Sequence, residues 1–122
     1  PGCACPRPLA IPHGHWLIFG YGRFGHAVAQ AFEAAGASWT ALDAEMRLAD
    51  EPHLQHRDNS EQSLHVAEID RAVGVVAGTD RDAINLAFVS RARRIKPDLC
   101  VLMRQNHVAD RSLIEASQAQ LV

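Results

Sequence analysis

The chain has 122 residues, of which 48% are hydrophobic, and carries a formal net charge of −2, with a mean hydropathy of −0.11. A chain of this length forms one domain with its own core. Its slightly acidic balance argues against nucleic acid as a partner and against attraction to an anionic membrane. No apolar stretch approaches the roughly 20 residues of a membrane span, and the first residues lack the apolar core of a secretory signal.

The proline-rich start of the chain is expected to be loosely ordered. We therefore expect residues 1–14 to form a linker arm and residues 15–122 to form the domain. Cys3 and Cys5 lie in this arm, but their spacing is not a standard zinc pattern. The sequence predicts no metal site, and its cysteine usage fits a reducing, cytoplasmic compartment.

The apolar run 16–19 ends at a glycine, which predicts a buried strand over 15–19. Apolar residues then recur at helical spacing and predict a helix over 23–35, which Gly36 ends. The turn between these elements reads Gly20-Tyr21-Gly22-Arg23-Phe24-Gly25. A glycine motif at a strand-to-helix turn indicates a dinucleotide-type fold.

Each glycine of this motif has a physical task. Gly20 permits the tight turn, Gly22 lets the backbone approach a pyrophosphate, and Gly25 lets helix and strand pack closely. The N–H groups at the start of the helix, together with its positive dipole end, would then face the anion. Arg23 would be unfavourable at this helix start unless a phosphate lies beside it. The alternative is that the turn is kept tight only for packing.

A second strand over 38–42 ends at Asp43, which lies 18 residues after Gly25. This spacing is close to that of the carboxylate that binds a ribose 2′-hydroxyl in dinucleotide-binding folds. The alternative is a solvated strand end or a helix N-cap. An acid at this point favours NAD or an adenine nucleotide over NADP, because a 2′-phosphate would meet its negative charge.

The rest of the chain alternates between helical and strand patterns. Thr79 is expected to act as the N-cap of a helix that ends before Pro97. Ser60 is expected to cap an earlier helix, which runs to about residue 66. The further elements are a short helix over 44–50, a strand over 54–56, a helix up to 66, a strand over 72–77, a helix up to about 95, a strand over 99–103, a helix over 108–117, and a strand over 121–122.

This alternation predicts an α/β fold, a Rossmann-like doubly wound parallel sheet with strand order 3-2-1-4-5-(6). In such a sheet the site lies at the carboxyl ends of the strands, where the strand order reverses. The candidate residues are therefore those just past the strand ends: Gly20 to Gly25, Asp43, Gly78, Thr79, Asp80, and Arg104 to Asn106.

Four segments together resemble one family. They are the glycine motif at 20–25, the acid Asp43, the segment Gly-Thr-Asp-Arg-Asp-Ala-Ile-Asn at 78–85, and the segment from Arg93 to Asn106. The resemblance is to the N-terminal domain of the regulator of K⁺ conductance (RCK) family, the Trk/KTN nucleotide-binding domain of potassium channels and transporters. It covers roughly residues 15–122.

The resemblance implies roles for particular residues. Gly20, Gly22, Arg23, Phe24 and Gly25 would hold the phosphates, and Asp43 would hold the ribose. Carried over in the same way, the remaining site residues are Tyr21, Ala44, Asp58, Asn59, Gly78, Thr79, Asp80 and Arg104. For Arg104 the alternative is a surface ion pair.

One position departs from the family pattern. The family usually has Gly-Asp-Ala-Ser or Gly-Asp-Ala-Thr after the third strand, and Arg57 stands here in place of the glycine. Asp58 keeps the acid that borders the adenine in the family. Arg57 either blocks the adenine edge or supplies an extra cation for a phosphate.

The resemblance implies a cytoplasmic regulatory domain at the inner membrane that binds NAD(H), AMP, ADP or ATP. It also implies a homodimer or higher gating assembly, and a transmembrane K⁺ channel or transporter domain on the same or a partner chain. No nucleophile–base pair stands out, so no catalytic residue is predicted and the domain is not expected to be an enzyme. Two alternatives stay open: the cofactor-binding domain of an NAD-dependent oxidoreductase, and a fold that serves only assembly.

Overall fold

The computed structural model describes residues 14–43, 53–56, 58, 60–116 and 120–121. Six parallel strands form one sheet in the order β3-β2-β1-β4-β5-β6. The predicted doubly wound order is therefore confirmed. The strands are β1 (His15–Phe19), β2 (Ser38–Asp43), β3 (Leu54–His56), β4 (Ala72–Ala77), β5 (Cys100–Met103) and β6 (Gln120–Leu121).

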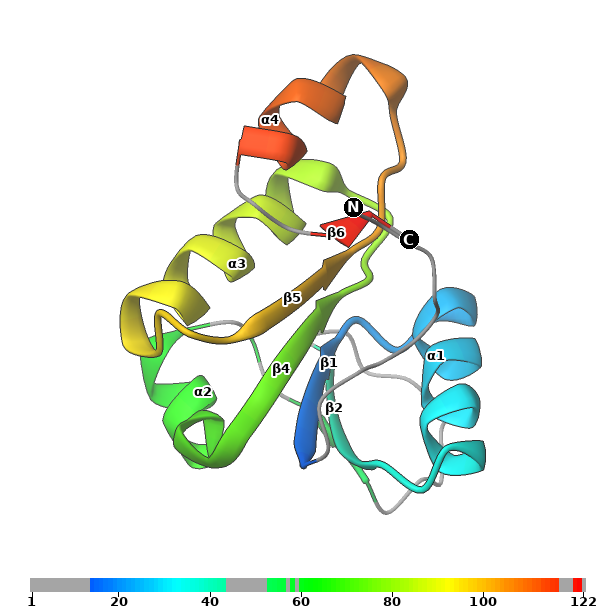
Figure 1. Ribbon diagram of the computed structural model, residues 1–122, viewed down its shortest axis with the longest axis vertical. Coiled ribbons are helices and arrows are strands. Elements are labelled where there is room, and N and C mark those ends of the chain that lie inside the picture. The colour runs from blue at the N-terminus through cyan, green and yellow to red at the C-terminus, as the bar shows by residue number, and fades with distance from the viewer. Residues whose placement is uncertain (1–13, 44–52, 57, 59, 117–119, 122) are drawn as a thin grey trace.

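Helices cover both faces of the sheet, with α1 on one side and α2 and α3 on the other (Figure 1). Short 3₁₀ turns, η1 (Ile69–Arg71) and η2 (Val108–Asp110), precede β4 and the last helix. The helices are α1 (Arg23–Ala34), α2 (Glu61–Val66), α3 (Asp82–Ile95) and α4 (Arg111–Ala116). Within the described part of the chain, none of them is long and apolar enough to cross a bilayer.

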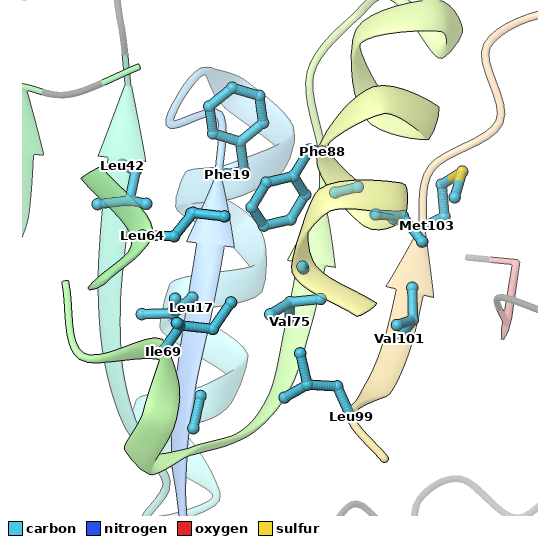
Figure 2. Packing of buried hydrophobic residues seen from close by; sticks show 14 of the residues in the cluster. Leu17, Phe19, Leu42, Leu64, Ile69, Val75, Phe88, Leu99, Val101 and Met103 are labelled. Atoms are coloured by element: carbon cyan, nitrogen blue, oxygen red, sulfur yellow. The ribbon is translucent and has the colours of Figure 1, made fainter. Parts of the chain in front are cut away.

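The alternation of side chains along β1 divides the core into two layers. Trp16 and Ile18 point to the face that α1 covers. Leu17 and Phe19 point to the opposite face, which α2, α3 and α4 cover. In that layer, Phe19 stacks on Phe88 of α3 with ring centroids 4.7 Å apart (Figure 2). Burial on both faces is why β1 reads as a continuous apolar run.

Two predicted helix ends are confirmed. Gly36 follows α1 with a φ of +77°, the left-handed conformation that favours glycine. Ser60 precedes α2, and its Oγ accepts a hydrogen bond from the backbone N–H of Ser63 at 3.2 Å. Both ends therefore follow from local backbone chemistry.

The N-cap assigned to Thr79 is wrong. Helix α3 begins at Asp82, after Arg81, and has no side-chain cap. The Thr79 hydroxyl donates to Oδ1 of Asn85 instead, at 2.6 Å. A buried amide facing the loop offers Thr79 a better partner than the first turn of the helix.

Three other expectations have different outcomes. The expected helix over 108–117 is η2 followed by α4. The expected helix over 44–50 lies outside the described residues, as does nearly all of the expected linker arm over 1–14.

Candidate functional site

The loops that follow β1, β4 and β5 meet at one edge of the sheet, where β2 also ends, because parallel strands end at the same edge (Figure 1). Backbone hydrogen bonds join each strand end to the loop of its neighbour. They run from the N–H of Gly20 to the carbonyl of Leu42 (2.8 Å), from Gly78 to Phe19 (2.9 Å), and from Arg104 to Ala77 (2.9 Å). The loops therefore continue the sheet's ladder and are held in a fixed order.

Two glycines of the motif occupy positions where a side chain would be strained or would clash. Gly20 has a φ of +96°, which favours glycine. A Cβ on Gly25 would lie 1.9 Å from the carbonyl oxygen of Gly20. Gly22 is the N-cap of α1 and has no side chain to occupy the helix's free N–H groups. The positive end of the α1 dipole therefore faces the loop, and no side chain of residue 22 covers it.

Asp43 is the last residue of β2, and the residue is only 5% exposed. One carboxylate oxygen, Oδ2, accepts a hydrogen bond from the backbone N–H of Tyr21 at 2.8 Å. The Tyr21 ring in turn stacks on Trp39, with centroids 5.9 Å apart. The acid is thus fixed against the glycine loop by an anchored residue.

A cavity of about 740 Å³ opens between these loops, which is within the range of small-molecule sites. Nine of the predicted residues line it: Gly20, Gly22, Arg23, Phe24, Asp43, Gly78, Thr79, Asp80 and Arg104. The sequence thus placed the glycine loop, the acid and both later loops at one cavity.

Among the described residues, five predicted ones are not in the cavity lining: Tyr21, Gly25, Asp58, Gln105 and Asn106. Tyr21 and Gly25 are buried behind the loop, where they hold Asp43 and the first turn of α1. Ala44 and Asn59 lie outside the described residues. Asp58 is described but serves the start of α2 instead.

Asp58 accepts hydrogen bonds from the Ser63 hydroxyl at 2.7 Å and from the Ser60 backbone N–H at 3.0 Å. These bonds to Ser63 and Ser60 lower the pKa of its exposed carboxyl to about 2. This local role is sufficient to explain an acid at position 58. The Arg57 alternatives remain predictions, because Arg57 lies outside the described residues.

Four lining residues were not predicted: Phe19, Ala27, Arg81 and Ile84. Ala27 lies one helical turn after Arg23 and therefore on the same face of α1, so the helical period could have predicted that it lines the cavity. Phe19 and Ile84 carry no such signal, because each also packs in the core below the cavity. Arg81 adds a cation at the start of α3.

Arginine supplies most of the charge at the cavity. Arg23, Arg81 and Arg104 all line it, together with Asp43 and Asp80. The Arg104 guanidinium lies over the Phe24 ring, 5.3 Å from its centroid, in a cation–π contact. The net positive lining and the end of α1 favour an anionic ligand.

The loops after β4 and β5 are joined through polar side chains. Asn85 is fully buried, and its Nδ2 donates to the Thr79 carbonyl at 3.1 Å. Asn106 donates to that same carbonyl at 3.1 Å. Asp82, 3% exposed, accepts hydrogen bonds from the loop after β5. Burial would raise the pKa of the Asp82 carboxyl, but the N–H donors of Asn106 and His107 outweigh it and lower that pKa.

The described part of the chain holds no cluster of three or more His, Cys, Asp or Glu side chains that could bind a metal ion. The cavity instead combines backbone N–H groups, guanidinium groups and one buried carboxylate. This combination suits phosphate groups and a sugar hydroxyl on one ligand.

The model of the TrkA-N domain family matches residues 16–122. The chain is similar to potassium channel protein 1 of Methanocaldococcus jannaschii, with 25% identity over 101 residues that make up 75% of this chain and 30% of the relative. The match therefore covers less than a third of the length of that channel.

Two solved structures have a similar fold. The GsuK channel bound to NAD has a TM-score of 0.82 at 24% identity, and the match covers 93% of this chain and 21% of that one. The AMP-bound form of the Kef CTD of Shewanella denitrificans has a TM-score of 0.68 at 27% identity, with coverage of 74% and 57%.

Proposed function

Because the chain belongs to the TrkA-N domain family, we propose that it senses a nucleotide and regulates a potassium channel or transporter. The observation that carries this proposal is the cavity between the start of α1 and Asp43. NAD(H), AMP, ADP and ATP are the candidate ligands. The NAD-bound and AMP-bound relatives support this choice of ligand class.

In this proposal the ligand's phosphates lie against the glycine loop. The N–H groups at the start of α1 and the side chain of Arg23 bind them. The ribose hydroxyls donate to Asp43, whose position is fixed by its hydrogen bond with Tyr21. Asp43 also disfavours NADP, because a 2′-phosphate would lie beside a buried negative charge.

Regulation follows if the ligand binds one arrangement of the assembly more tightly than another. We propose a homodimer or higher assembly at the cytoplasmic face of the membrane, which transmits this preference to a K⁺ pathway on the same or a partner chain. The potassium channel relative, which is longer than this chain, supports that arrangement. It also favours regulation over the alternative of an oxidoreductase cofactor domain.

Calorimetric titration with NAD⁺, NADH, AMP, ADP and ATP tests this function. We expect at least one of them to bind at submillimolar concentration. A matched variant, Gly22→Leu, should abolish binding, since position 22 lines the cavity at an ordinary φ of −86°. Its oligomeric state should equal that of the unmodified chain.

Two results would speak against the proposal. Absence of heat with every nucleotide at millimolar concentration contradicts sensing. Unchanged binding by Gly22→Leu contradicts the assigned site. The regulatory step itself is tested by K⁺ flux through the channel or transporter that the domain serves, with and without the nucleotide that binds.

A further inference from the structure

Asp82 lies in the first turn of α3, but its carboxylate binds a different segment of the chain. Oδ1 accepts from the backbone N–H of Asn106 at 2.8 Å and from its Nδ2 at 2.9 Å. Oδ2 accepts from the backbone N–H of His107 at 2.9 Å. An acid in a first helical turn ordinarily interacts with the N–H groups of its own helix. Here it binds the loop after β5.

That loop begins with Arg104 and is held at both ends. The N–H of Arg104 donates to the Ala77 carbonyl at 2.9 Å, and Asp82 binds the two residues at 106 and 107. Between these anchors the Arg104 side chain extends over Phe24 and lines the cavity. The Nη1 atom of Arg104 also lies 3.5 Å from the Gly78 carbonyl oxygen.

We propose that Asp82 is a positioning residue: by fixing the loop after β5, it holds Arg104 where its guanidinium binds a ligand phosphate. Asp82 is not among the residues that line the cavity, so its effect on binding is indirect, and the proposal assigns this effect to Arg104. This inference rests on the proposed nucleotide binding and adds a residue that the binding depends on.

The carboxylate is needed because both of its oxygens accept hydrogen bonds. An Asn side chain has the same shape but only one acceptor oxygen, and its NH₂ group would face an N–H donor. In Asp82→Asn the loop therefore loses part of its attachment. The Arg104 side chain then samples more rotamers before it meets a phosphate, which weakens binding.

A double-mutant cycle measured by ADP titration of the 122-residue chain tests this inference. The variants are Asp82→Asn, Arg104→Gln and the double variant, and the control is Asp98→Asn, which makes the same change at an exposed position before β5. We expect each single variant to bind ADP about tenfold more weakly. The double variant should bind no more weakly than Arg104→Gln alone, and the control should bind normally.

Unchanged ADP binding by Asp82→Asn overturns the inference. So does an Asp82→Asn effect that persists in full when Arg104 is absent, because a merely structural role would give that result. If Asp82→Asn does not fold, Asn106→Ala takes its place. It removes the Nδ2 group that donates to Asp82 and to the Thr79 carbonyl. Its weakening of about threefold should disappear in the Arg104→Gln background, and a weakening that persists there would contradict the inference.

A different result would contradict the proposed function. An unmodified chain that binds none of NAD⁺, NADH, AMP, ADP and ATP contradicts nucleotide sensing itself. Normal binding by the unmodified chain together with normal binding by Asp82→Asn contradicts only the role of Asp82.

Discussion

The buried carboxylate of Asp43 and the backbone N–H of Tyr21 are 2.8 Å apart and hydrogen-bonded. This bond joins the end of β2 to the glycine loop between β1 and α1. It places the proposed ribose acceptor beside the proposed phosphate site, so one nucleotide can reach both. The geometry also makes the acid and the glycine loop interdependent.

Asp43→Asn should weaken the binding of ADP and NAD⁺ by about tenfold, or about 1.4 kcal/mol, because a neutral amide accepts a ribose hydroxyl less strongly than a carboxylate. The same change should narrow the preference for NAD⁺ over NADP⁺, because the repulsion of the 2′-phosphate is removed. Calorimetric titration with each nucleotide measures both effects. Equal NAD⁺ and NADP⁺ affinities in the unmodified chain would refute this role for Asp43.

Gly25→Ala should destabilise the fold by about 3 kcal/mol, because its Cβ would meet a backbone oxygen that cannot move aside cheaply. Gly36→Ala is the matched control. It has a φ of +77° and no atom within 4 Å of the added Cβ, so it should cost only about 1 kcal/mol of backbone strain. Urea unfolding monitored by circular dichroism compares the two. Equal losses would mean that the close contact between loop and helix is not maintained in solution.

Phe24→Leu should weaken ADP binding by about threefold, since it removes the ring on which the Arg104 guanidinium rests. A Leu side chain keeps most of the apolar volume beside Gly78, so the unfolding midpoint should change little. Titration and thermal unfolding of the same sample separate the two effects. A large fall in the unfolding midpoint together with unchanged ADP affinity would contradict this prediction.

His15 should make the fold sensitive to mild acid. Its ring bridges Ser38 Oγ at 2.7 Å and Thr40 Oγ1 at 3.0 Å. Burial, with the added charge of Arg71, lowers its pKa. The unfolded chain therefore takes up a proton more readily than the folded one, and the free energy of unfolding falls as pH drops below about 6.5.

The His15→Asn variant tests this pH dependence. Its unfolding free energy should depend less on pH between 7.5 and 5 than that of the unmodified chain, as measured by urea titration at each pH. An identical slope for the two proteins would exclude His15 as a source of the acid sensitivity.

Much of the fold could be predicted because local patterns and sheet topology agree. The apolar run of β1, the glycine turn and the spacing to Asp43 each point to the same strand order. The site along the glycine loop followed from that order, since the strands of a parallel sheet end together.

The parts that sequence reasoning missed depend on contacts between distant residues. Thr79 has the composition of an N-cap, but Asn85 is its partner in the folded chain. Asp82 looks like an acid that serves its own helix, whereas its donors lie 24 and 25 residues away. No local pattern encodes these pairings. They arise only when the loops after β4 and β5 meet at the sheet edge.

A crystal structure of the chain with ADP tests the central claim most directly. The account predicts density for the phosphates against the N–H groups at the start of α1, and for a ribose hydroxyl within hydrogen-bond distance of Asp43. An ADP molecule bound elsewhere, or a ribose turned away from Asp43 toward solvent, would contradict it.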